Sequence, residues 1–302
     1  MEDMITGLCP QCGHTLHIPA ELASFSCMYC GARLTKEQLA AEPLAAQEAD
    51  EDRAAYYDRA VSRLGWCIKN FGGYQKKIMR DVFFEAFETY ETGCAPVIQE
   101  LARGVAPEQQ TQLLGRAAAA MLDELEAGWQ KKGDMEDEKI VLAIFFVPMV
   151  RKQQLPISEE FVTILQKQWV ERYPKSPFYL GDYESISGGF RKKFLGLCFI
   201  TTAVCQELGK PDDCEELTAF RAFRDGYLRS QPDGEALIRE YYNIAPGIVT
   251  CINTCSDRHA SYARIREEYL APCYQDLLAG RNESCKARYV RMVRDLEREY
   301  LS

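Results

Sequence analysis

The chain has 302 residues, of which 47% are hydrophobic and 27% are charged, and its formal net charge is −9. This composition is ordinary for a globular protein, and the length allows one or two domains plus a small module. The negative charge argues against a protein that coats nucleic acid, because phosphate binding needs a local cationic excess.

The start of the chain, "MEDMITGLCPQC", does not have the pattern of a secretory signal, because it is acidic and lacks an apolar segment. The longest apolar runs, "IVLAIFFVPMV" and "FLGLCFITTAVC", have 11 and 12 residues, whereas a membrane-spanning helix needs about 20. We therefore expect a cytoplasmic protein with no membrane segment. Its thirteen cysteines would then be thiols or metal ligands rather than disulfides.

Residues 5–34 are rich in cysteine and glycine and contain two C-x2-C pairs. The four cysteines are Cys9, Cys12, Cys27 and Cys30, with fourteen residues between the pairs. Two such turns together offer four thiolates, which is a tetrahedral ligand set that Zn²⁺ prefers. Short strands are expected at 15–19 and within 24–34. The segment resembles a zinc ribbon.

The cysteine spacing also suits a rubredoxin-type iron site, whereas disulfides are not expected without export. His14 and His17 lie between the pairs, but four thiolates already satisfy the metal. Such a closed site leaves no position for a substrate, so we expect a structural metal that supplies the folding free energy of a very small module. Arg33 is the only Lys or Arg in residues 1–34, which argues against nucleic-acid binding by the ribbon.

Residues 35–52 are rich in alanine and glutamate, and we interpret them as a short helix followed by an acidic linker. Apolar residues then recur at helical spacing, which predicts a helical domain over 53–175. Pro148 predicts an end or a kink in one of its helices. A stretch rich in Pro, Gly and Ser at 173–190 predicts a boundary, and a second helical domain follows over 190–302. The predicted fold class is mainly α, a multi-helix body with a small β-type zinc-ribbon module at the N-terminus.

Three motifs follow one another between residues 194 and 250. Their characteristic residues are Cys198, Phe199, Ile200, Thr202 and Ala203 in the first motif, Phe220, Arg221, Phe223, Arg224 and Asp225 in the second, and Gly234, Tyr241, Tyr242, Ala245 and Pro246 in the third. Together they resemble the CFI-box family, a bacterial C-terminal domain of uncharacterised function. The chain departs from the pattern at Val204 and Cys205, where many members carry an aromatic residue and a glycine. The resemblance implies a bacterial origin and no particular activity.

Cysteines of this second domain form a candidate site of their own. Cys198 and Cys205 lie in an almost wholly apolar run, which predicts a buried helix over 194–208. Cys251, Cys255 and His259 follow at spacings of four, and in one continuous helix they would project from one side. The five residues could form a second metal site between two helices. The alternative is that the cysteines are small core residues and that His259 is polar surface.

Arg221 and Asp225 are four residues apart and can pair along a helix. An arginine here could recognise a carboxylate or a phosphate. We interpret Arg221 instead as one member of an ion pair at the edge of the apolar face with which the helix packs.

Two functional hypotheses follow. The first is a non-enzymatic binding or scaffold protein, in which a structural zinc ribbon is joined to a helical body that holds a protein partner. It depends on the ribbon and on the lack of any nucleotide-binding loop or acid/base motif. The alternative is a thiol- or metal-dependent enzyme that uses Cys198, Cys205, Cys251, Cys255 and His259. His259 is the only histidine outside the ribbon, so Cys–His catalysis in the helical part would need it.

Overall fold

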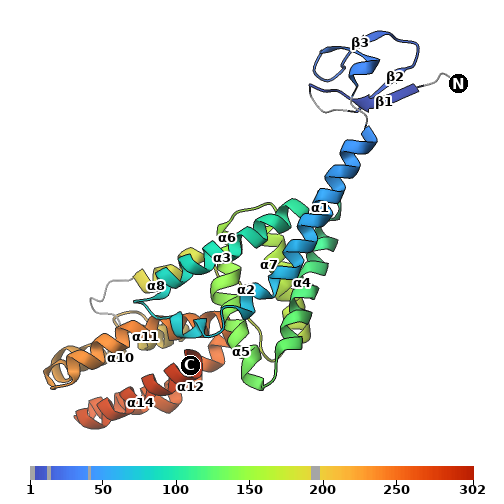
Figure 1. Cartoon of the computed structure of the whole chain (residues 1–302). Coiled ribbons are helices and arrows are strands. Elements are labelled where there is room, and N and C mark those ends of the chain that lie inside the picture. The colour runs from blue at the N-terminus through green and yellow to red at the C-terminus, as the bar shows by residue number, and fades with distance from the viewer. Residues whose placement is uncertain (1–3, 12–14, 40–41, 192–197) are drawn as a thin grey trace.

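The computed structural model describes residues 4–11, 15–39, 42–191 and 198–302. A small β-module comes first and a body of packed helices follows, so the chain is mainly α as the sequence predicts (Figure 1). Of the helices in these residues, none is both long enough and apolar enough to cross a membrane.

The β-module consists of two antiparallel pairs of strands. These are β1 (Met4–Leu8) with β2 (Thr15–Pro19), and β3 (Ser24–Ser26) with β4 (Arg33–Thr35). Its small core consists of the buried side chains of Cys9, Leu16, Cys27 and Leu34. A short 3-10 turn, η1 (Lys36–Gln38), follows, and the Gln38 side chain accepts a hydrogen bond from the Thr35 N–H at 2.9 Å. The β2 bounds agree with the predicted strand, whereas β1 was not predicted.

The segment predicted as a linker, residues 35–52, differs in the structure. Helix α1 (Glu42–Leu64) already begins within it. Pro43 lies in the first turn of this helix. Backbone N–H groups there have no partner within the helix, so the missing N–H of proline costs no hydrogen bond. Alanine, glutamate and glutamine are strong helix formers, so the stretch is helical although it has no apolar period. The prediction gave too much weight to the absence of apolar residues at helical spacing.

The first half of the body extends from α1 to α7. Its further elements are α2 (Trp66–Lys69), η2 (Tyr74–Lys77), α3 (Phe83–Gly104), η3 (Pro107–Gln109), α4 (Gln110–Gly128), α5 (Lys132–Val141), η4 (Leu142–Phe146), α6 (Val147–Lys152) and α7 (Ser158–Arg172). The element η4 is a π-helical turn that ends two residues before Pro148, and all its residues are buried. A π-turn shifts the hydrogen-bond pattern by one residue, which lets the helix pass a proline that has no N–H. Where the sequence predicts an end or a kink, the structure has this π-turn, and the helix continues through Pro148 to Lys152.

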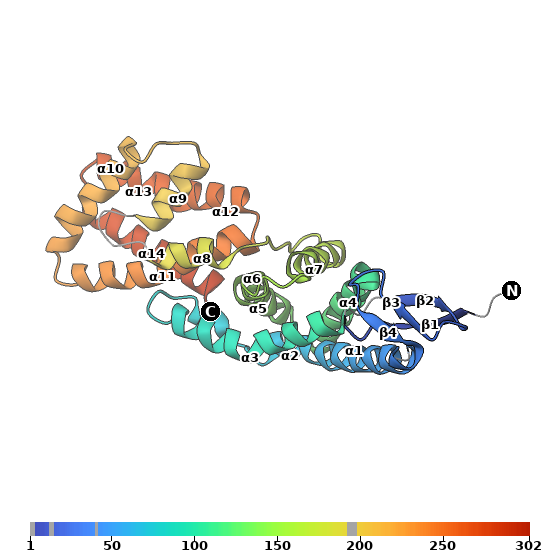
Figure 2. The same cartoon turned by 90° about the horizontal axis from the view of Figure 1, so that it is seen from above.

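The second half of the body extends from α8 to α14. Its elements are α8 (Tyr183–Arg191), α9 (Phe199–Glu207), α10 (Glu215–Ala222), the π-turn η5 (Phe223–Tyr227), η6 (Leu228–Ser230), α11 (Gly234–Cys255), α12 (Arg258–Ile265), the π-turn η7 (Arg266–Leu270), α13 (Ala271–Leu278) and α14 (Asn282–Tyr300). Figure 2 shows these helices at the opposite end of the molecule from the β-module.

The two halves pack around one continuous cluster of buried side chains that extends from Tyr57 to Leu301. Phe83 of α3 stacks on Phe190 of α8 with ring centroids 4.2 Å apart. Gly247 of α11 lies so close to the backbone of the first half that a β-carbon there would be 1.9 Å from the carbonyl oxygen of Ile78. The predicted domains 53–175 and 190–302 therefore share one core, a property that a loop composition at 173–190 does not reveal.

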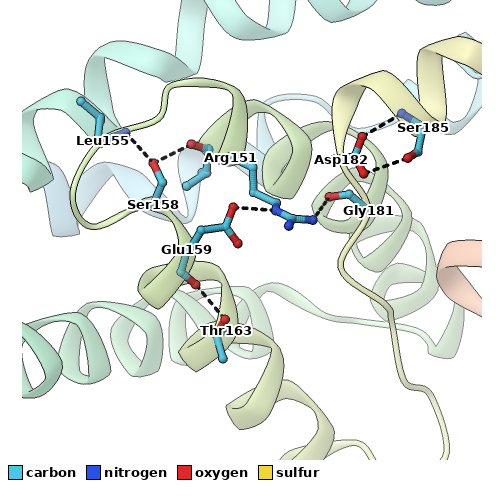
Figure 3. A network of polar contacts seen from close by, with 9 residues as sticks. Arg151, Leu155, Ser158, Glu159, Thr163, Gly181, Asp182 and Ser185 are labelled. Atoms are coloured by element: carbon cyan, nitrogen blue, oxygen red, sulfur yellow. Dashed lines mark hydrogen bonds and ion pairs between the residues drawn. The ribbon is translucent and has the colours of Figure 1, made fainter.

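Arg151 holds the segment that connects the two halves of the body (Figure 3). Its Nε donates to Glu159 Oε1 at 2.9 Å, and its Nη1 donates to the carbonyl of Gly181 at 3.0 Å. Directly after Gly181, the Asp182 carboxylate accepts a hydrogen bond from the Ser185 N–H at 2.8 Å, which lowers the pKa of Asp182. These contacts connect α6, α7 and the start of α8.

Candidate metal centre

Three cysteines of the β-module form a cluster with metal-ligand geometry. The sulfur atoms of Cys9, Cys27 and Cys30 all lie within 4.8 Å of one another. The Cys9 and Cys30 sulfurs are 3.7 Å apart. Four sulfurs arranged as a tetrahedron at about 2.3 Å from a central Zn²⁺ would be separated by about 3.8 Å, whereas a disulfide needs about 2.05 Å. The cluster could therefore hold a metal ion.

The local fold explains why these sulfurs converge. Cys9 follows β1, while Cys27 and Cys30 occupy the turn between β3 and β4. In that turn Gly31 donates from its N–H to the Cys27 carbonyl at 2.8 Å, and it has a φ of 75°. Glycine takes such a positive φ without a steric penalty. The turn closes with a hydrogen bond of 2.8 Å from the Cys27 N–H to the carbonyl of Ala32.

Burial differs among the three thiols. Cys9 and Cys27 are buried and Cys30 is exposed, so an ion at this place would lie at the edge of the small core. The predicted fourth ligand, Cys12, lies outside the described residues, as does His14. His17 is exposed on β2 and does not belong to the cluster. The donor set is therefore sulfur-rich, as the C-x2-C spacing predicts.

The five residues of the predicted second site do not come together as a metal site. Those residues are Cys198, Cys205, Cys251, Cys255 and His259. Within the described residues, the cluster in the β-module is the only group of three or more Cys, His, Asp or Glu donors close enough to share an ion. Of the two alternatives, the arrangement therefore favours core cysteines over a second metal site.

His259 is separated from the cysteines because the helix breaks before it. Helix α11 ends at Cys255, and α12 begins at Arg258. Asp257 caps α12, its carboxylate accepting a hydrogen bond from the Ala260 N–H at 3.1 Å. Aspartate favours this N-cap position over a helix interior. The His259 side chain is 80% exposed and lies 3.2 Å from the Glu207 carboxylate.

The cysteine thiols have separate surroundings. The Cys251 sulfur donates to the Tyr300 carbonyl at 3.6 Å, and the Cys198 sulfur lies 3.7 Å from Arg224 Nη1. Burial raises the pKa of Cys198, and it raises the pKa values of Cys205 and Cys255 to about 12. A thiol with such a pKa stays protonated at neutral pH, which makes it a poor primary nucleophile. The environments of Cys198, Cys251 and Cys255 are those of core cysteines.

The expected pair between Arg221 and Asp225 does not form. Arg221 pairs instead with the Asp212 carboxylate at 2.7 Å. Asp225 accepts two hydrogen bonds from Arg224, from Nε at 2.8 Å and from Nη2 at 2.6 Å. Both Arg224 and Asp225 lie in the π-turn η5, where residues four apart no longer stack as they do in an α-helix.

A polar network, which sequence reasoning missed, connects the three motifs of residues 194–250. Arg224 Nη1 donates to the Tyr242 hydroxyl at 3.0 Å, joining the second motif to the third. The Ile200 N–H donates to the Tyr241 hydroxyl at 2.9 Å, joining the first motif to the third. The motif residues themselves were the only signal in the sequence. A cavity of about 60 Å³ lies beside this network, with a lining of mostly apolar side chains.

Comparisons with known proteins add no assignment to these observations. No protein-family model, no curated protein and no solved structure matches this chain. The resemblance of residues 194–250 to the CFI-box family therefore stays a prediction from the three motifs, and the function has to be inferred from the geometry of the chain itself.

Proposed function

We propose that this chain is a non-enzymatic binding or scaffold protein whose N-terminal module holds Zn²⁺ and recognises a protein partner. One observation carries the proposal. Met28 and Tyr29 lie between the ligands Cys27 and Cys30, and they are 80% and 57% exposed. Large apolar side chains on a short turn that a metal would fix form a small preorganised recognition surface.

The chemistry of the donor set supports zinc as the ion. Cysteine thiolates are soft ligands, and a closed site built only from them is typical of structural zinc. Such an ion would supply the folding free energy that the few buried side chains of the β-module do not. Cys12 completes the set in this proposal.

A protein partner agrees better with the charge of the module than a nucleic acid does. Met28 and Tyr29 have no basic side chains beside them in the sequence, and nucleic-acid recognition needs a cationic surface. Methionine and tyrosine are both enriched in protein–protein interfaces. A cytoplasmic location and membership of the CFI-box family belong to the same proposal.

The test is a cross-linking and affinity-capture experiment with the full-length chain in its native cells. Partners captured by the wild type are identified and then compared with those of the double variant M28S/Y29S. The matched control is Leu278→Ser, because Leu278 is 64% exposed on α13, far along the chain from the module. The proposal expects a partner that the control retains and the double variant loses. If the double variant captures the same proteins as the wild type, the recognition surface lies elsewhere and the proposal fails.

A further inference from the structure

Two thiols in the second half of the body form a close pair, one buried and one partly exposed. The sulfurs of Cys205 and Cys214 lie 3.8 Å apart. Cys205 is in the last turn of α9, and Cys214 immediately precedes α10. The sulfur–sulfur bond of a disulfide is about 2.05 Å long. The two sulfurs would therefore have to move less than about 2 Å closer to form it.

The turn between the two thiols is held at both ends. The Lys210 N–H donates to the Cys205 carbonyl at 2.9 Å, and the Cys214 N–H donates to the Pro211 carbonyl at 3.1 Å. The Lys210 ammonium reaches across to Glu216 of α10 at 2.7 Å. These contacts hold the backbone of the α9–α10 connection that carries the two thiols.

Access to solvent distinguishes this pair from the other thiol pairs in the body. Cys214 is half-buried and Cys205 is 1% exposed. The thiol pairs Cys67/Cys94 and Cys273/Cys285 are also in contact, but all four of these residues are 0% exposed. An oxidant in water can therefore reach Cys214, whereas the two buried pairs are shielded while the chain is folded.

We propose that Cys205 and Cys214 are a peroxide-sensitive dithiol that closes to a disulfide between α9 and α10. The Cys214 thiolate attacks one oxygen of hydrogen peroxide, the O–O bond breaks, and Cys214 becomes a sulfenic acid as hydroxide leaves. The Cys205 sulfur then attacks the sulfenic sulfur, the S–O bond breaks, and water leaves once the Cys205 proton has been transferred. In total, two thiols and one hydrogen peroxide give one disulfide and two waters.

Burial raises the pKa of Cys205 to about 12, and the neighbouring Cys214 contributes to that rise. The difference in exposure suits the proposed roles. Cys214 reacts with the oxidant. Cys205 acts only as the resolving thiol, and the Cys214 sulfur that it attacks is by then a neutral sulfenic acid.

The test is peptide mapping of the folded, full-length wild type after a time course with hydrogen peroxide. Free thiols are first blocked with an alkylating reagent, and the chain is then cleaved after glutamate. Cleavage after Glu207 separates Cys205 from Cys214, so their disulfide is seen as two linked peptides that dithiothreitol releases. We expect this linked pair to form about tenfold or more faster than a Cys67–Cys94 or Cys273–Cys285 link, because Cys214 is the accessible thiol among these three pairs. Equal rates for the three pairs, or oxidation of Cys214 beyond the sulfenic acid with no link, would overturn the proposal.

Two variants test the separate roles. Cys205→Ser should accumulate sulfenic acid at Cys214, which dimedone traps, because the resolving thiol is gone. Cys214→Ser should leave Cys205 unoxidised, because it is buried. Far-UV circular dichroism and the thermal midpoint show whether each variant is folded, and the wild-type map decides the proposal even if one is not. A dimedone adduct on Cys205→Ser no greater than on the wild type would contradict the assigned order.

Discussion

Arg224 Nη1 donates a hydrogen bond of 3.0 Å to the hydroxyl of Tyr242, eighteen residues further along the chain. Arg224 is buried, and its remaining contacts include the two hydrogen bonds to Asp225. The guanidinium therefore connects the π-turn η5 to the central helix α11. A buried cation that is fully paired adds little net stability, but removing its contacts is costly because polar groups stay buried without partners.

Replacing Arg224 with methionine should therefore lower the free energy of unfolding by about 2–4 kcal/mol, because the Tyr242 hydroxyl loses a charged donor and the aliphatic side chain leaves space. The control is Arg298→Ala. The Arg298 side chain is 74% exposed and pairs at the surface with Asp295, so its loss should cost less than about 0.5 kcal/mol. Urea unfolding followed by circular dichroism gives both values. Equal losses in the two variants would contradict the assigned role of Arg224.

The ion pair between Arg224 and Asp225 predicts a dependence of stability on pH. The hydrogen bond from Arg224 lowers the pKa of Asp225 below its usual 3.8. A lowered folded-state pKa contributes stability that is fully present above the unfolded-state pKa and is lost as the pH falls through the folded-state value. Asp225→Asn should therefore be less stable than wild type by about 1 kcal/mol at pH 7, a small value because the carboxylate is half exposed and screened by water. The difference should shrink below about pH 4. Urea unfolding of both proteins between pH 3 and 7 measures it, and a constant difference over that range would contradict the assignment.

Gly247 tests the contact between the two halves of the body. An alanine there would place its β-carbon 1.9 Å from the backbone oxygen of Ile78, so α11 would have to move away from the first half. We expect Gly247→Ala to cost about 3 kcal/mol or more in unfolding free energy. Gly188→Ala in α8 is the matched control, because nothing lies within 4 Å of its β-carbon. It should be neutral or stabilising by about 0.5–1 kcal/mol, as is usual for this change inside a helix. If Gly247→Ala unfolds at the same urea concentration as Gly188→Ala, the two halves are not in the contact described.

Local pattern was sufficient for much of the fold. The strand at 15–19 agrees with β2, and the helical domain predicted over 190–302 agrees with α14, where Met292, Val293 and Leu296 are buried. Both follow from the periodicity of a single element. The two C-x2-C pairs likewise predict that Cys9 meets Cys27 and Cys30, because such pairs at this separation are typical of one shared metal site.

Long-range contacts were not predictable in the same way. The partner of Arg221 is Asp212, which the α9–α10 turn brings close, rather than Asp225 on the same helical pattern. A second metal site required a single helix through His259, but Asp257 caps a new helix instead. In both cases, the competing interaction comes from a turn whose geometry the spacing of residues does not encode.

The most direct measurement is the metal content of the purified full-length chain. Inductively coupled plasma mass spectrometry on the wild type should give one zinc per chain, and Cys9→Ser and Cys27→Ser should each lose most of it, because both thiols belong to the sulfur cluster. Cys255→Ser should retain the zinc, since that cysteine is buried in α11 and outside the cluster. A wild type without bound metal, or with a metal that Cys9→Ser and Cys27→Ser retain, would contradict a zinc-stabilised recognition module.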